Sequence, residues 1–140
     1  MVERKGYLDE LKSWKDDKVI KIVTGMRRCG KSTLLIQFQE WLVENGIDPV
    51  QIIYVNFEEL EFEHLLDYKE LYDYIKDRLD KNRNNYVFLD EIQKVESYEK
   101  VVDSLFVKEN VDIYITGSNS DMLSGDLATN LTGRYVEIQI

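Results

Sequence analysis

The chain has 140 residues, of which 44% are hydrophobic, and this is the size and composition of one globular domain with a real core. Its 18 basic and 27 acidic residues give a net charge of -9, so the surface as a whole repels polyanions and is a poor candidate for binding nucleic acid directly. No apolar run is long enough to span a membrane, and residues 1–6 lead into no apolar signal segment, which favours a soluble, cytoplasmic protein.

The first elements in chain order are a helix, a strand and a second helix. Apolar residues recur at helical spacing in residues 3–16 and predict an amphipathic helix. The apolar run 18–24 predicts a short buried strand, and residues 32–43 predict the next helix. Between them, residues 25–32 read Gly-Met-Arg-Arg-Cys-Gly-Lys-Ser and match the phosphate-loop pattern G-x-x-x-x-G-K-[ST]. The strand before and the helix after this pattern disfavour an ordinary glycine-rich turn.

The residue types of this loop suit the binding of a triphosphate. Glycines at both ends let several backbone N–H groups turn toward an anion, and the helix that begins near Gly30 adds its positive dipole end. Lys31 would reach the β- and γ-phosphates, and the Ser32 hydroxyl would ligate a magnesium ion. The residues predicted to bind the nucleotide are Gly25, Arg27, Arg28, Cys29, Gly30, Lys31, Ser32 and Thr33.

Three residues within the loop leave alternatives open. Cys29 is the only cysteine of the chain, so no internal disulfide is possible, and its variable position in the pattern favours a small filler over a redox role. Arg27 and Arg28 either contact phosphate or are simply exposed there.

Strands and helices alternate along the rest of the chain. Asn45-Gly46 followed by Pro49 predicts the end of the second helix. Two further helices are predicted, over residues 68–79 and 98–106, the second with Ser97 as its N-cap. Four further strands are predicted, over residues 51–57, 86–89, 111–116 and 134–140. Continuously apolar strands that alternate with helices indicate a three-layer α/β fold, with a mostly parallel sheet covered on both faces.

The most acidic stretch is residues 58–80, which contain nine acidic residues and three basic ones. This pattern is typical of a solvated helix face and loop. His64, the only histidine, lies in this stretch without a partner at metal-ligand spacing, so a surface or packing role is favoured.

Two adjacent carboxylates, Asp90 and Glu91, follow the apolar strand 86–89. Ligands of open α/β sheets bind beyond the carboxyl ends of the strands, so we expect both side chains beside the phosphate loop. Asp90 can hold magnesium together with Ser32, and Glu91 can orient and polarise a water molecule for attack on the γ-phosphate. Acidic residues often end strands, so the prediction depends on the combination with the loop.

Three polar residues further along are candidates for the same rim. Ser118 and Asn119 follow the fourth strand and could sense the γ-phosphate or the attacking water, although ordinary turn chemistry explains them equally well. Arg134 comes just before the last strand and could act as an arginine finger, the alternative being a surface arginine.

Four motifs in this order carry a resemblance to a known family: residues 25–32, 89–93 (Leu-Asp-Glu-Ile-Gln), 116–118 (Thr-Gly-Ser) and 131–134 (Leu-Thr-Gly-Arg). The chain resembles the AAA-type ATPases in the catalytic-glutamate branch of the P-loop NTPases. More narrowly, it is similar to poorly characterised bacterial and archaeal predicted ATPases in which a C-terminal domain of unresolved function follows the ATPase domain.

The resemblance implies a P-loop NTPase fold with a five-stranded sheet of order 5-1-4-3-2, and ATP and magnesium as ligands. It implies Lys31 and Ser32 as the Walker A pair. It implies Asp90 and Glu91 as the Walker B pair. Unlike a typical AAA module, the chain ends before any helical lid, so we expect it to be an N-terminal piece of a longer protein.

The predicted function is magnesium-dependent ATP hydrolysis by an AAA-type domain over residues 1–140, with the NTPase core over 18–140. The activity would be coupled to a conformational switch, to the missing C-terminal region, to a partner protein or to a second copy. A nucleotide-binding interaction module with negligible hydrolysis is the first alternative. A small-molecule kinase is less favoured, because no arginine-bearing lid or acceptor pocket is visible. GTP is disfavoured as the nucleotide, because no Asn-Lys-x-Asp run is present to bind guanine.

Overall fold

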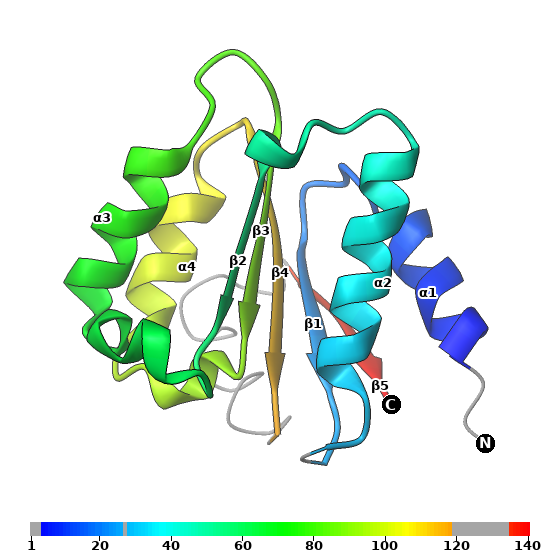
Figure 1. Ribbon diagram of the computed structural model, residues 1–140, viewed down its shortest axis with the longest axis horizontal. Coiled ribbons are helices and arrows are strands. Elements are labelled where there is room, and N and C mark those ends of the chain that lie inside the picture. Colours follow the sequence, from blue (N-terminus) through cyan, green and yellow to red (C-terminus); the bar gives the residue numbers. More distant parts are fainter. Residues whose placement is uncertain (1–3, 27, 119–134) are drawn as a thin grey trace.

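The computed structural model describes residues 4–26, 28–118 and 135–140. Its centre is a five-stranded sheet in which every neighbouring pair of strands is parallel (Figure 1). In spatial order the strands are β2 (Ile52–Asn56), β3 (Asn85–Asp90), β4 (Val111–Gly117), β1 (Ile20–Thr24) and β5 (Tyr135–Gln139). This is the predicted order 5-1-4-3-2 counted from the opposite edge, so that prediction is confirmed.

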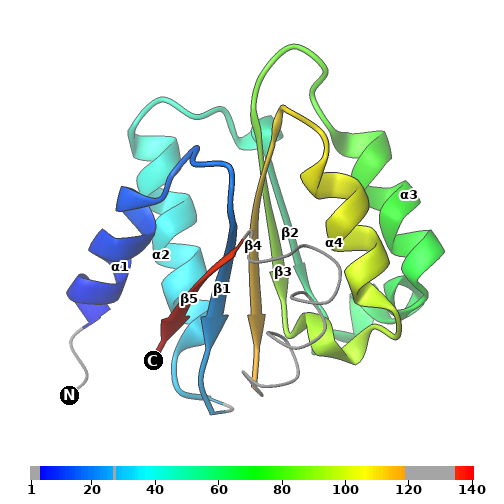
Figure 2. The ribbon, with the colours of Figure 1, turned by 180° about the vertical axis from the view of Figure 1, so that it is seen from behind.

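Helices cover both faces of the sheet and complete the predicted three layers (Figures 1 and 2). One face carries α1 (Arg4–Ser13) and α2 (Lys31–Glu44), and the other carries α3 (Tyr68–Arg78) and α4 (Tyr98–Phe106). Three short 3-10 helices connect these elements: η1 (Pro49–Gln51), η2 (Leu60–Leu66) and η3 (Ile92–Lys94). No helix in the described ranges is long and apolar enough to cross a membrane.

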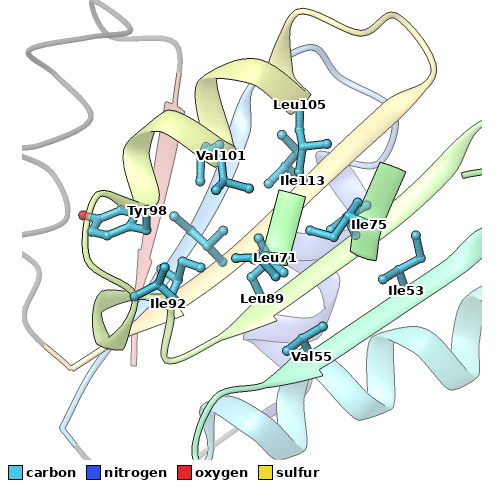
Figure 3. Close-up of a cluster of buried hydrophobic side chains, with 14 of the residues drawn as sticks. Ile53, Val55, Leu71, Ile75, Leu89, Ile92, Tyr98, Val101, Leu105 and Ile113 are labelled. Atoms are coloured by element: carbon cyan, nitrogen blue, oxygen red, sulfur yellow. The ribbon is translucent and has the colours of Figure 1, made fainter. Parts of the chain in front are cut away.

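The sheet has a separate apolar core on each face because successive side chains of a strand point to opposite sides. All residues of β1, β3 and β4 are buried, whereas the edge strands β2 and β5 are partly exposed. Val87 and Leu89 belong to the buried cluster that includes side chains of α3 and α4, and Leu89 is labelled in Figure 3. Phe88 points the other way and stacks on Tyr114 with ring centroids 4.7 Å apart, beneath α2. Burial on both faces explains the continuously apolar strand sequences.

Most predicted elements are found within two residues of their predicted bounds, with two corrections. The first helix ends at Ser13 rather than at residue 16, because the N–H groups of Trp14 and Lys15 donate only three residues back, to Leu11 O and Lys12 O. Asp16 then has left-handed backbone (φ 67°), and its N–H donates to Asp112 Oδ2 over 2.9 Å. The second correction concerns Ser97, which precedes α4 but makes no side-chain cap hydrogen bond. Its backbone is left-handed (φ 62°), whereas a capping serine has extended backbone that directs its oxygen at the free N–H groups.

Candidate active site

The carboxyl ends of the strands all lie at one edge of the sheet, the lower edge in Figure 1. The phosphate loop connects the end of β1 to the start of α2 at this edge. Asp90 ends β3, an inner strand of the sheet, and Ser118 follows the adjacent central strand β4. The fold therefore gathers the predicted site residues that it describes at one place, as expected for an open α/β sheet.

The structure explains why positions 25 and 30 of the phosphate loop are both glycine. A Cβ added to Gly25 would lie 2.6 Å from Cys29 Sγ and 3.3 Å from the carbonyl oxygen of Ile140, so the loop is folded tightly against the end of β5. Gly30 has left-handed backbone (φ 103°), which favours glycine, and its carbonyl accepts the first helical hydrogen bond of α2 from Leu34 N. The close approach to Gly25 agrees with the small-filler interpretation of Cys29. The N–H groups of the first turn of α2 face the loop, as in other anion sites at helix N-termini.

Lys31 is buried, with 3% of its surface exposed, and its side chain turns back into the phosphate loop. Its Nζ donates to the carbonyl oxygens of Gly25 at 2.7 Å and Met26 at 3.0 Å. The same atom lies 3.2 Å from Glu91 Oε2. The ammonium group thus fills the centre of the loop, where its charge is offset by oxygen atoms that a phosphate oxygen can replace.

Asp90 is fully buried and accepts three side-chain hydrogen bonds. Its Oδ2 accepts from Ser32 Oγ at 2.5 Å and from Tyr54 OH at 2.8 Å, and its Oδ1 accepts from Thr116 Oγ1 at 2.6 Å. These donors offset the cost of burying the carboxylate. Burial, followed by the charge of Asp90, raises the pKa of the Tyr54 hydroxyl far above its usual value, so this group stays a donor.

Glu91 has left-handed backbone (φ 60°), which is rare outside glycine and common at functional sites. Its N–H donates to Thr116 Oγ1 at 2.8 Å, and the residue is 5% exposed. Burial acts to raise the pKa of Glu91, but hydrogen bonds from Gln93 and Ser118 and the charge of Lys31 outweigh burial and lower the pKa below its usual value. The carboxylate is therefore ionised at neutral pH.

The oxygen atoms at this site fit a magnesium ion bound to phosphates. Magnesium prefers oxygen ligands and is commonly held by one or two carboxylates together with substrate phosphates and water. The hydroxyl of Ser32 and the carboxylate of Asp90 are in contact and can face the same ion. Among the described residues, no group of three or more His, Cys, Asp or Glu is arranged to hold a metal by itself.

The remaining predicted site residues are less central. Arg28 and Thr33 are exposed on the phosphate loop and the first turn of α2. Arg27, Asn119 and Arg134 lie outside the described residues, so their predicted roles stay predictions.

A cleft of about 360 Å³ opens beside the phosphate loop. It is lined by Thr24, Gly25, Met26, Ser118, Gln139 and Ile140. A larger groove of about 800 Å³ lies between the ends of α3 and α4 and contains none of the predicted site residues. The arrangement of charged and hydroxyl groups, rather than volume, therefore identifies the site.

Three residues that contact the acidic pair were not predicted as site residues. Tyr54 and Thr116 lie on the strands that flank β3, and their positions follow from the sheet order combined with polar residues near strand ends. Gln93 donates to Glu91 Oε1 over 2.6 Å from η3. In the sequence it is the last residue of the motif 89–93 that carries the family resemblance, and no role was predicted for it.

The parallel sheet, the phosphate loop after β1 and the acidic pair after β3 define the class of this chain, an α/β domain with the P-loop NTPase fold. A family model described as an AAA domain matches residues 17–140. The chain belongs to this family, and the predicted resemblance to AAA-type domains is confirmed.

Known proteins similar to the chain include two curated relatives. An uncharacterized protein of Haemophilus influenzae is 45% identical over 141 residues, which cover 100% of the chain and 35% of that protein. An uncharacterized protein of Methanocaldococcus jannaschii is 36% identical over 122 residues, which cover 86% of the chain and 26% of that protein. The chain thus spans about a third or less of the length of these relatives.

A solved structure with the same fold is that of a DNA polymerase III gamma subunit-related protein of Thermotoga maritima. The two match with a TM-score of 0.66 at 12% identity, over 95% of the chain and 45% of that structure. At this identity the likeness concerns the fold alone.

Proposed function

We propose that this domain binds ATP with magnesium and hydrolyses it, and that the nucleotide state controls the rest of a longer protein or a partner. The observation that carries the proposal is the convergence of Lys31, Ser32, Asp90 and Glu91 on one side of the phosphate loop. Family membership supports nucleotide binding, and this convergence supports hydrolysis as the reaction.

Lys31 and the first turn of α2 would bind the phosphates. The ammonium group already lies among carbonyl oxygens of the loop, so a triphosphate offers it stronger, fully charged acceptors. Ser32 and Asp90 would hold a magnesium ion, which supplies charge neutralisation on the phosphates.

Glu91 would orient the attacking water and accept its proton. Its Oε2 lies 3.2 Å from Lys31 Nζ, so a γ-phosphate bound by Lys31 would come close to this carboxylate. Ser118 and Asn119 would sense the γ-phosphate, and Ser118 already donates to Glu91 Oε1 at 2.9 Å. Arg134 would stabilise the transition state, as developed in the Discussion.

The partners proposed here are ATP and ADP, a C-terminal region of the longer protein, and a protein partner or a second copy. The short share of each relative that the chain covers supports the proposal of further regions. A cytoplasmic location is proposed because ATP, magnesium and reduced thiols are abundant there, which suits a domain with one free cysteine.

Two substitutions test the proposal by separating binding from turnover. Lys31→Ala should weaken ATP binding about tenfold to a hundredfold, because a hydrogen bond between charged groups contributes about 1.5 to 3 kcal/mol. Glu91→Gln keeps the shape of the side chain but removes the base, so it should abolish phosphate release and leave ATP affinity at least as high as in the parent. Calorimetry with ATP and magnesium, together with a phosphate-release assay, measures both effects.

The outcomes distinguish the alternatives. ATP binding by the parent without phosphate release would favour the nucleotide-binding module. ATP turnover that requires a small-molecule acceptor, with the γ-phosphoryl group transferred to that acceptor instead of being released as free phosphate, would favour a kinase. Unchanged ATP affinity in Lys31→Ala would contradict the assignment of the phosphate loop.

A further inference from the structure

Gln93 has a side chain that turns back onto the carboxylate of Glu91. It lies in η3, two residues after Glu91, and its Nε2 donates to Glu91 Oε1 over 2.6 Å, the shortest of the hydrogen bonds that this carboxylate accepts. The Oε1 atom of Gln93 is buried and has no hydrogen-bond partner among the described residues. Burying an amide oxygen without a hydrogen-bond partner costs free energy. The side chain of Gln93 thus makes its hydrogen bond to Glu91 at the cost of leaving its own oxygen unsatisfied.

The two carboxylate oxygens of Glu91 have different surroundings. Oε1 accepts from Gln93 and from Ser118, whereas Oε2 lies beside the ammonium group of Lys31. If Lys31 moves to phosphate oxygens, as the proposed function requires, Oε2 loses its cation and Oε1 keeps its donors. Binding of a triphosphate would therefore free one oxygen and leave the other held.

Gln93 is better placed than Ser118 to keep holding Oε1 when nucleotide is present. Ser118 lines the cleft beside the phosphate loop, and its Oγ lies 3.5 Å from Lys31 Nζ, so it is within reach of a bound phosphate. Gln93 does not line that cleft, and among the described residues its side-chain amide donates to Glu91. The backbone of Glu91 is fixed separately, because its N–H donates to Thr116 Oγ1.

We propose that Gln93 is a positioning residue that fixes the Glu91 carboxylate through Oε1 and leaves Oε2 as the oxygen that orients the attacking water. The inference rests on the proposed hydrolysis and specifies how its base is held. A glutamate side chain has three rotatable bonds, and a base displaced by about 1 Å can lose a hundredfold in rate. The effect of Gln93 should therefore appear in turnover and not in nucleotide binding.

The test is Gln93→Met, which keeps the length of the side chain and removes the donor. The kcat for phosphate release should fall about tenfold to a hundredfold, with KM for ATP within about twofold of the parent. The affinity for ADP should be unchanged, whereas the affinity for ADP with fluoroaluminate, a transition-state analogue that needs a positioned water, should fall by a similar factor. In a Glu91→Gln background, where phosphate release is already abolished, Gln93→Met should cause no further loss of affinity for the fluoroaluminate complex, because the group that it holds no longer acts as a base.

Two more variants separate the donor from packing and folding. Gln93→Glu has the shape of glutamine but sets a second carboxylate against Glu91, so its kcat should be at least as low as that of Gln93→Met. Gln39→Met makes the same substitution on α2, where the amide is also partly buried, and should leave turnover at the parent level. The melting temperature of each variant shows that it is folded.

Parent-level kcat and parent-level affinity for the fluoroaluminate complex in Gln93→Met would overturn the inference while leaving ATP hydrolysis intact. An equal loss of ADP affinity would overturn it as well, because it would indicate a damaged nucleotide site. A parent protein that releases no phosphate contradicts the proposed function and removes this inference with it.

Discussion

Asp90 shows how strongly a single side chain at this site depends on its neighbours. Three hydroxyl groups, from α2, β2 and β4, donate to its two oxygens, and none of them is near it in sequence. Ligands of metal ions commonly keep such outer partners, which orient them and tune their basicity. Of these three donors, Ser32 belongs to the phosphate loop and Thr116 to the central strand β4, whereas Tyr54 lies on the edge strand β2.

Tyr54→Phe should weaken the magnesium dependence of ATP binding, because it removes one donor and lets the Asp90 carboxylate rotate. Loss of an outer partner of a metal ligand costs about tenfold to a hundredfold in metal affinity. Calorimetric titration of ATP across a magnesium series measures the effect, and Asp90→Asn should give a larger one. Tyr72→Phe, on α3 away from the site, is the matched control. Equal magnesium dependence in Tyr54→Phe and the control would show that the hydroxyl is dispensable.

The main residues of the site were predictable because the phosphate-loop motif has a fixed spacing and a fixed structural setting. Lys31 and Ser32 follow from that motif, and Asp90 follows from its place at the end of an apolar strand. Tyr54 and Thr116 were not predicted: the predicted strand order places β2 and β4 beside β3, but the contact with Asp90 also depends on the register of these strands, which the sequence pattern does not determine.

At the scale of elements, the connection between α1 and β1 is fixed by a buried polar network under the N-terminal helix. Lys21 on β1 is fully buried and is paired with Asp112 on β4. Asp112 Oδ2 also accepts from Tyr114 OH at 2.7 Å and from the N–H of Asp16. This network sets where α1 ends, and it could not be predicted from local sequence because its members are about 90 residues apart.

Lys21→Met should destabilise the domain by about 3 to 5 kcal/mol, because it leaves the carboxylate of Asp112 buried without its cation. Burial already raises the pKa of Asp112 against the opposing charge of Lys21, so the loss of that charge raises the pKa further. Urea unfolding monitored by circular dichroism measures the change. The double variant Lys21→Met with Asp112→Leu should recover most of the stability, since neither charge remains buried. A single variant as stable as the parent would show that water reaches this network.

At the scale of the whole molecule, charge determines which partners are favoured. The net charge is -9, and the lysines of the groove between the ends of α3 and α4, such as Lys76 and Lys108, are interleaved with Asp77 and Glu109. The described surface therefore has no basic stripe in this groove that could follow a phosphate backbone.

The domain should show no appreciable affinity for duplex DNA at physiological salt, because nucleic-acid affinity rests mainly on lysine and arginine contacts to phosphates. A gel shift with low-micromolar protein tests this, with and without ATP. A clear shift that weakens as salt is raised would contradict this prediction.

Arg134 supports a prediction about assembly. It comes immediately before β5, which pairs with the strand that leads into the phosphate loop. An arginine finger acts on charge that develops in the transition state and contributes about 10³-fold or more in rate. We therefore expect the isolated domain to hydrolyse ATP slowly, and we expect Arg134→Ala to lower the remaining rate without lowering ATP affinity.

The dependence of specific activity on protein concentration distinguishes an arginine that acts within its own chain from one that acts on a neighbouring copy. If Arg134 completes the site of a neighbouring copy, the specific activity of the parent should climb as copies associate, and that of Arg134→Ala should stay low and flat. If it acts within its own chain, the activity of the parent should be independent of concentration. Mixing Arg134→Ala with Glu91→Gln separates the two cases further, because Glu91→Gln alone is inactive, Arg134→Ala alone is slow, and a shared site combines the intact Glu91 of one with the intact Arg134 of the other. Turnover of Arg134→Ala equal to the parent at every concentration would pass the role to Arg27, Arg28 or a region beyond this chain.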